Sequence, residues 1–288
     1  MQVEKKYPSF IIGGAPKCGT SSLYFWLAAH PEACGSKIKE PYYFDNRITR
    51  FNENASYLKD GLDAYDQYFK HCSTDSKAFE ASAGYLYATD TAVEGFQKLP
   101  EVPKVIFILR YPSKQLVSHY KMTKYRLNRK VDHLMEYATR ERVDLFWHYS
   151  KSLEAWLDNY PKDKLKVVLF EDLISNKVEG MKEIARYLDI DPSFYDEFDF
   201  EHRNESVAIK RKGLHDFGLK VQRYIPHFIQ KRLLPLYLKT NSSNIPKLSE
   251  AEEQFLVEMQ PEFEAERKRL EELLPQQSFA SWDKFGVK

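Results

Sequence analysis

The sequence is poor in cysteine and has no long apolar run. Its 288 residues include only three cysteines, Cys18, Cys34 and Cys72, an odd number without a CxxC pair. A disulfide framework or a zinc site is therefore not expected, and a reducing compartment fits this cysteine usage best. The first residues, MQVEKKYPSFIIGG, lack the apolar core and the cleavage site of a signal peptide. Because no apolar run approaches the length of a membrane span, we expect a cytoplasmic protein.

The chain also lacks an excess of charge of either sign. Its 43 basic and 42 acidic residues give a formal net charge of +1. Since nucleic-acid-binding proteins normally carry a basic excess, the composition argues against a nucleic-acid partner. The length suffices for one large α/β domain with a sizeable core. No repeat, low-complexity linker or change of composition marks a second domain, so we predict a single domain over residues 1–288.

Strand and helix patterns alternate along the first two thirds of the chain. Short apolar runs predict buried strands, and longer segments with apolar residues at helical spacing predict helices. The strands are expected at 10–13, 104–110 and 164–173. The helices are expected at 20–29, 112–127, 152–161 and 178–188. Strands separated by helices indicate an α/β three-layer sandwich, with a central, mainly parallel sheet between two layers of helices.

The last third of the chain has a different character. The stretch from Lys220 to Lys239 mixes basic and apolar residues. Such a segment can contact a membrane surface or a lipid-linked acceptor, but it is more often a docked helix with one solvated face. Ser249 and Glu252 form the pattern of a capping box, which predicts the start of a helix. Pro261 should then kink this helix or divide it in two.

The stretch IIGGAPKCGTSSLYFWL, residues 11–27, has the pattern of a phosphate-binding loop. A glycine turn that leads from an apolar strand into a helix forms an anion site from its main-chain N–H groups. The residues that permit the turn and open the helix are Gly13, Gly14, Gly19, Thr20, Ser21 and Ser22. In an ATPase loop, GxxxxGK[ST], a lysine directly follows the second glycine. Here Thr20 occupies that position and Lys17 lies in mid-loop, so the loop suits a phosphate but not a triphosphate with magnesium.

Three segments together resemble a family. PKCGTSSL resembles the 5′-phosphosulfate loop of sulfotransferases that use 3′-phosphoadenylyl sulfate (PAPS). VIFILRYPSKQLVSHY is similar to their 3′-phosphate motif, in which a strand-end arginine and a helix serine, here Arg110 and Ser118, can hold one phosphate from two sides. KEPYYFD, residues 39–45, resembles the segment of heparan-type and bacterial carbohydrate sulfotransferases whose glutamate is the catalytic base. That glutamate maps onto Glu40.

The resemblance implies a metal-independent, PAPS-dependent sulfotransferase with a P-loop-like phosphate site, and its segments extend over roughly residues 9–282. The implied donor-binding residues are Lys17, Cys18, Gly19, Thr20, Ser21, Ser22, Arg110, Ser118, Lys212 and Gly213. Lys17 is expected to neutralise charge on the leaving oxygen, and Glu40 to take the proton of the acceptor. Direct transfer requires no covalent intermediate, so Cys18 is expected to fill the loop rather than act as a nucleophile. The acceptor is a hydroxyl or an amine on a carbohydrate, a glycolipid or a small natural product.

The same segments supply candidates for acceptor binding and for a rival base. The implied acceptor-binding residues are Lys39, Tyr43, Glu80, Ser82 and Tyr85, although core packing explains the aromatic ones equally well. The chain has Ala81 where heparan 3-O-sulfotransferases carry an acceptor-site lysine. Glu80 is the rival carboxylate for the role of base, or a structural group. His119 and His30 are further candidates because some sulfotransferases use a histidine base.

Two other functions remain open on the sequence alone. A P-loop nucleotide kinase would require magnesium and ATP, and the position of Lys17 argues against it. A non-catalytic nucleotide-binding module would retain Lys17 and Arg110 but would show no turnover.

Overall fold

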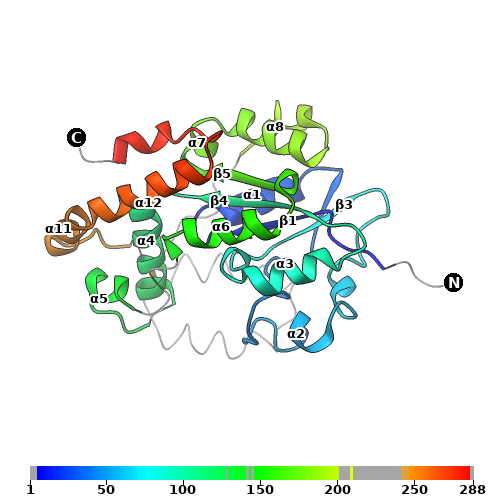
Figure 1. Ribbon diagram of the computed structural model, residues 1–288, viewed down its shortest axis with the longest axis horizontal. Helices are drawn as coiled ribbons and strands as arrows, with labels where there is room; N and C mark the ends of the chain where they lie inside the picture. The colour runs from blue at the N-terminus through cyan, green and yellow to red at the C-terminus, as the bar shows by residue number, and fades with distance from the viewer. Residues whose placement is uncertain are drawn as a thin grey trace.

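Five parallel strands form the central sheet. The computed structural model describes residues 5–127, 129–140, 143, 146–200, 208–209, 242–243 and 245–285. The strands are β1 (Phe10–Gly14), β2 (Ala33–Gly35), β3 (Lys77–Ala81), β4 (Lys104–Leu109) and β5 (Leu165–Leu169). Their order across the sheet is β2-β3-β1-β4-β5, and every neighbouring pair is parallel. Figure 1 shows β1, β3, β4 and β5 in the centre of the molecule.

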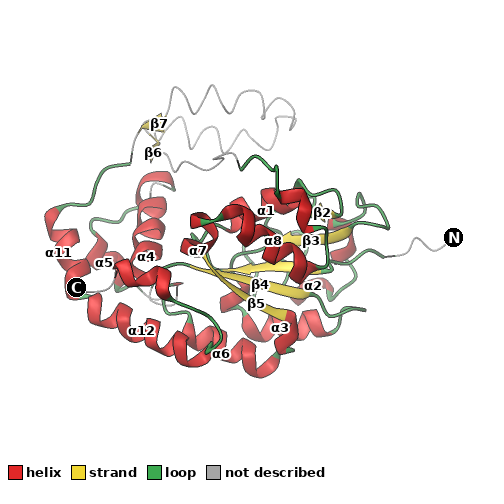
Figure 2. Ribbon diagram, turned by 90° about the horizontal axis from the view of Figure 1, so that it is seen from above, coloured by secondary structure: helices red, strands yellow, loops and turns green. Residues whose placement is uncertain are grey.

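Helices cover both faces of this sheet, as the alternating pattern predicted (Figure 2). On one face lie α1 (Thr20–Ala28), α7 (Phe170–Ser175) and α8 (Lys177–Leu188). On the other lie α3 (Thr89–Gln97), α6 (Ser150–Asn159) and α12 (Gln260–Leu273). Among the described residues, the other α-helices are α2 (Tyr57–Asp60), α4 (Pro112–Lys121), α5 (Leu134–Ala138) and α11 (Glu250–Glu258). The architecture is therefore the predicted α/β three-layer sandwich. Within the described ranges, no helix is long and apolar enough to cross a membrane.

Of the three strands that the sequence predicted, β1 and β4 are neighbours within the sheet and β5 lies at its edge. The segment 164–173 is a strand only to Leu169, because α7 begins at Phe170. Every residue of β1 is buried, and so is all of β4 after its first residue. The sequence pattern did not predict β2 or β3. β2 has only three residues, and β3, with the sequence KAFEA, carries Glu80 in its buried interior. A charged side chain within a short strand removes the apolar run on which the prediction rests.

Two predictions for the C-terminal helices are confirmed. Ser249 and Glu252 form the capping box at the start of α11: Glu252 N donates to Ser249 Oγ at 3.3 Å, and Ser249 N donates to Glu252 Oε2 at 3.0 Å. α11 ends at Glu258 and α12 begins at Gln260, so Pro261 lies in the first turn of a new helix. Proline is tolerated there because its missing N–H would have no partner within the helix.

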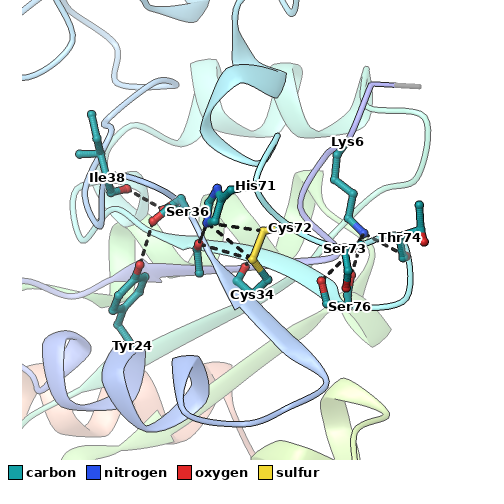
Figure 3. Close-up of a disulfide and its surroundings, with 11 residues drawn as sticks. Lys6, Tyr24, Cys34, Ser36, Ile38, His71, Cys72, Ser73, Thr74 and Ser76 are labelled. Carbon is teal, nitrogen blue, oxygen red and sulfur yellow. Dashed lines mark hydrogen bonds between the residues drawn. A yellow bond between two sulfur atoms is a disulfide. The ribbon is translucent and has the colours of Figure 1, made fainter. Parts of the chain in front are cut away.

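The expectation that the chain has no disulfide is wrong. Cys34 in β2 is bonded to Cys72, which is 38 residues further along the chain, and Figure 3 shows His71 beside the pair. β2 pairs with β3, so the loop that leads into β3 brings Cys72 to Cys34. Cys18 is free and buried, and this accounts for the odd number of cysteines. The cysteine usage therefore no longer argues for a reducing compartment.

Candidate functional site

The candidate site lies at the carboxyl ends of the parallel strands, where α/β sheets commonly bind ligands. The loop between β1 and α1 forms its base. Ala15 N donates to the carbonyl of Ile108 in β4 at 2.8 Å, which ties the start of the loop to the neighbouring strand. Lys17 and Gly19 have positive φ angles of 67° and 95°. A Cβ at Gly19 would lie 2.7 Å from the ring of Phe170, so both the backbone angle and the close approach require glycine.

The loop ends at an open helix terminus. Gly19 provides no side-chain hydrogen bond to the first turn of α1, which begins at Thr20. The first N–H groups of a helix have no partner within the helix, and they carry the positive end of the helix dipole. The hydroxyls of Thr20, Ser21 and Ser22 add donors at the same place. The arrangement is that of an anion site.

Cys18 faces the interior. Its Sγ lies 3.6 Å from Tyr149 Oη, which donates to the carbonyl of Arg110 at 3.0 Å. Burial raises the pKa of the Cys18 thiol to about 12, so the thiol stays protonated. Cys18 is therefore a packing residue of the loop, and only its main chain is available to a ligand.

A cavity of about 850 Å³ opens over the loop. The predicted donor-site residues that line it are Lys17, Gly19, Thr20, Ser21, Ser22, Arg110 and Ser118. Glu40 lines the same cavity from the segment that follows β2. The structure thus brings together residues from three stretches that are far apart in the sequence. Lys212 and Gly213, and the stretch from Lys220 to Lys239, lie outside the described residues.

Arg110 follows β4 and leans over the loop. Its Nη1 donates to the carbonyl of Lys17 at 3.4 Å, and its Cζ lies 4.8 Å from the centroid of the Phe170 ring. Its Nε is buried and has no hydrogen-bond partner among the residues described. A buried guanidinium N–H without a partner costs free energy that an anionic ligand would recover. Ser118, two turns along α4, lines the cavity with it.

The cavity is electropositive around Lys17. Burial lowers the pKa of Lys17, and the nearby positive charges of Arg126 and Arg110 lower it further. Because an anion would reverse that destabilisation of the charged amine, the loop favours a negatively charged ligand.

The two candidate histidines occupy different environments. His119 lines the cavity, and its Nδ1 lies 2.5 Å from Tyr137 Oη. Burial, with a smaller effect of Lys17, lowers the pKa of His119 to about 4, so its imidazole is neutral at pH 7. His30 is buried away from the cavity, with Nε2 2.9 Å from the carbonyl of Asp191. The geometry therefore leaves His119 as the histidine that could act in the site.

Glu40 is accessible at the cavity wall. Its carboxylate accepts from Lys39 Nζ at 2.7 Å, and 37% of its side chain is exposed. Because it lines the cavity together with Lys17, it is placed to act on a group bound there.

The other predicted acceptor-binding residues do not reach the cavity. Tyr43, Glu80, Ser82 and Tyr85 are fully buried, and neither they nor Lys39 line it. They form the wall behind Glu40: Tyr85 Oη and Ser82 Oγ donate to the Glu80 carboxylate at 2.9 and 2.6 Å. In this structure these four side chains are therefore not exposed to an acceptor in the cavity.

The sequence interpretation missed an arginine cluster on the cavity wall. Four exposed arginines line it: Arg47, Arg50, Arg126 and Arg129. They are absent from the ion pairs within 4.0 Å among the described residues. The charge of Arg47 nevertheless acts on Asp45, which lines the same cavity, and opposes the rise that burial causes in the pKa of that carboxyl group. Phe51 packs beside them. Arg50 Cζ lies 4.9 Å from the centroid of the Phe51 ring, and the centroids of the Tyr42 and Phe51 rings are 5.4 Å apart. The signal was present in the sequence, since each pair of arginines is spaced by three residues in a segment next to a donor or base motif.

Comparisons with known proteins show the family of this chain. A model of the sulfotransferase domain matches residues 7–211. The human bifunctional heparan sulfate N-deacetylase/N-sulfotransferase 2 is 28% identical over 204 residues, which are 65% of this chain and 22% of that protein. The Drosophila melanogaster bifunctional heparan sulfate N-deacetylase/N-sulfotransferase is 26% identical, covering 84% of this chain and 26% of its own length. The chain thus spans about a quarter of these curated relatives.

A solved structure shows the same fold along nearly the whole chain. The crystal structure of a sulfotransferase from Alicyclobacillus acidocaldarius superimposes with a TM-score of 0.65 at 22% sequence identity, covering 96% of this chain and 99% of the other. The domain match covers well over half of the chain and includes the phosphate loop, Glu40, Arg110 and Ser118. The chain belongs to the sulfotransferase domain family, the family of PAPS-dependent enzymes that its motifs resemble.

Proposed function

We propose that this protein transfers the sulfuryl group of PAPS to a hydroxyl or an amine of an acceptor. The observation that carries the proposal is the buried Nε of Arg110, which has no hydrogen-bond partner among the described residues. Arg110 shares its cavity with the open N-terminus of α1 and with Glu40. The loop would hold the 5′-phosphosulfate end of the donor, and Arg110 with Ser118 would hold its 3′-phosphate. The carboxylate of Glu40 and the amine of Lys17 then lie at the phosphosulfate end of the donor, where the reaction takes place.

The chemistry needs one base and one positive charge. The acceptor oxygen or nitrogen attacks sulfur while the bond from sulfur to the phosphate oxygen breaks, and PAP leaves. Glu40 takes the acceptor proton, and Lys17 stabilises the charge that develops on the departing oxygen. A sulfuryl group carries less negative charge than a phosphoryl group, so a lysine can do what magnesium does in kinases.

The arginine cluster bears on the acceptor. Guanidinium groups bind carboxylate, sulfate and phosphate in a bidentate manner, and an aromatic face such as Phe51 suits a sugar ring. An acidic carbohydrate therefore fits better than a neutral natural product. The similarity to heparan sulfate sulfotransferases supports the same choice. A glycolipid with a charged headgroup remains compatible with this chemistry.

The donor is tested by thermal unfolding with ligands. PAP, with EDTA present, should stabilise the protein by about 2.7 kcal/mol at a hundredfold excess over its dissociation constant. ATP with magnesium should stabilise it much less. Stronger stabilisation by magnesium–ATP than by PAP would overturn the proposal in favour of a nucleotide kinase.

The acceptor is tested by a screen with labelled PAPS and mass-spectrometric detection of products. Acidic and neutral oligosaccharides of equal length form matched pairs. Arg47→Ala and Arg50→Ala should raise KM for the acidic member roughly tenfold, the worth of one charge-assisted hydrogen bond, and leave KM for PAPS unchanged. Stable PAP binding without turnover on any acceptor would favour a non-catalytic nucleotide-binding module.

A further inference from the structure

Glu80 has an unusual place for a charged residue. It lies in β3, is fully buried, and its carboxylate accepts hydrogen bonds from three hydroxyls. Tyr65 Oη and Tyr85 Oη donate to Oε1 at 2.6 and 2.9 Å, and Ser82 Oγ donates to Oε2 at 2.6 Å. The carboxylate does not line the cavity. A buried carboxylate is costly to retain, and packing alone does not require one.

Two of these hydroxyls also hold the segment that carries Glu40. Tyr42 N donates to Ser82 Oγ at 3.0 Å, and Phe44 N donates to Tyr85 Oη at 3.3 Å. On the other side of Glu40, Ala81 N donates to the carbonyl of Lys39 at 3.2 Å. The main chain around Glu40 is thus attached to the end of β3 on both sides of that residue.

We propose that Glu80 is a positioning residue, which fixes the Glu40 segment against β3 through the hydroxyls of Ser82 and Tyr85. The proposal rests on the proposed function, in which Glu40 is the base. Each hydroxyl has one proton and can accept in return. When both protons point at the carboxylate, the lone pairs of both oxygens are directed to the N–H groups of Tyr42 and Phe44.

The charge of Glu80 sets this direction. An ionised carboxylate only accepts, so it fixes the hydroxyl protons, whereas an amide or a protonated carboxyl would also donate and compete with the two main-chain N–H groups. Burial raises the pKa of Glu80 to about 7, while the hydrogen bonds from Ser82, Tyr65 and Tyr85 oppose that rise and the charge of Glu40 adds to it. The positioning arrangement is therefore complete when Glu80 is ionised.

The chain offers a matched set of variants. Ser82→Ala and Tyr85→Phe each remove one hydroxyl that joins Glu80 to the segment. Tyr65→Phe removes a hydroxyl that donates to the same carboxylate and holds no N–H group of the segment. Ser82→Ala and Tyr85→Phe should lower kcat roughly ten- to a hundredfold, because small misplacements of a reacting group cost that much, and leave KM for PAPS within about twofold. Tyr65→Phe should keep the kcat of the wild type, although its melting temperature should fall by about as much as those of Ser82→Ala and Tyr85→Phe.

Double variants separate this proposal from the proposed function. If the hydroxyls act through Glu40, then Tyr85→Phe should have no further effect on kcat in a Glu40→Gln background. A loss of kcat in Tyr65→Phe as large as in Tyr85→Phe, or a full additional loss in the Glu40→Gln background, would overturn the positioning role. Retention of kcat by Glu40→Gln itself would instead overturn the assignment of the base. Glu80→Gln, where it folds, should behave as Tyr85→Phe does.

Discussion

The guanidinium of Arg110 donates a hydrogen bond to the main-chain carbonyl of Lys17 at 3.4 Å, although 93 residues separate the two in the sequence. The bond joins the end of β4 to the phosphate loop after β1, and these strands are neighbours in the sheet. The two groups proposed to hold opposite ends of one nucleotide are therefore fixed to each other before the nucleotide binds. Such preorganisation reduces the conformational entropy that the protein loses when the nucleotide binds.

Arg110→Ala should separate two nucleotides that differ by one phosphate. Charge-assisted hydrogen bonds are worth roughly 1.5–3 kcal/mol each, so PAP binding should weaken about ten- to a hundredfold. Adenosine 5′-phosphosulfate, which lacks the 3′-phosphate, should bind almost as before. Isothermal titration of both ligands to both proteins measures the difference. Equal losses for the two ligands would mean that Arg110 acts only by holding the Lys17 carbonyl.

Removal of the disulfide should destabilise the protein without removing its fold. A disulfide typically contributes about 2–4 kcal/mol, mainly by restricting the unfolded chain. The variant Cys34→Ser/Cys72→Ser should therefore melt roughly 5–10 °C lower. Dithiothreitol should lower the melting temperature of the wild type by a similar amount and leave that of the variant unchanged.

Thiol titration of the unfolded chain provides an independent check on the disulfide. Without reductant only Cys18 should react, and after reduction Cys34 and Cys72 should react as well. Reaction of all three cysteines without reductant would contradict the pairing.

The parts of the site that the sequence predicted are those that depend on contiguous residues. The phosphate loop contains its own glycines, and the strand, Arg110 and Ser118 follow one another within one motif. The parts that the sequence analysis did not predict, the disulfide and the contacts of Glu80, depend on which strands pair with each other. Cys34 reaches Cys72 only because β2 pairs with β3, and Glu80 reaches the Glu40 segment only across that same pairing. Local periodicity contains no information on which strands are neighbours.

The prediction of acceptor-binding residues depends on the fold in the same way. A motif indicates that Tyr43, Ser82 and Tyr85 lie near the site, but it does not say which way each side chain points. All three are buried behind the Glu40 segment, where their hydroxyls bind protein atoms. The arginine pairs Arg47/Arg50 and Arg126/Arg129 have the same spacing of three residues, but only the fold places both pairs on one cavity.

Glu80 should make stability depend on pH. Its pKa is raised from 4.5 to about 7 in the folded state, so the folded protein holds this proton more tightly than the unfolded chain does. The stabilisation is full below pH 4.5 and is lost as pH rises through 7. Between pH 5 and 8 the loss from this group is on the order of a few kcal/mol.

The comparison of wild type with Glu80→Gln isolates this contribution. His119, whose pKa is lowered to about 4, gives a slope of opposite sign between pH 4 and 6.5 that both proteins share. Denaturant unfolding at pH 5 and pH 8 measures the change for each protein. Wild type should lose more stability than Glu80→Gln over that range, by about the amount given above. Equal changes in the two proteins would show that Glu80 titrates normally.

The assignment of the base is tested by comparing Glu40 with His119, which lines the same cavity. Glu40→Gln keeps the shape of the side chain and removes its basicity, so PAP affinity should change by no more than about twofold. A lost general base typically lowers turnover ~10²–10⁴-fold, and we expect kcat to fall by that amount. His119→Ala is the matched variant, because His119 is neutral at pH 7 and lines the same cavity. If Glu40→Gln keeps most of its kcat while His119→Ala loses it, the imidazole that Tyr137 holds is the base and Glu40 only shapes the wall.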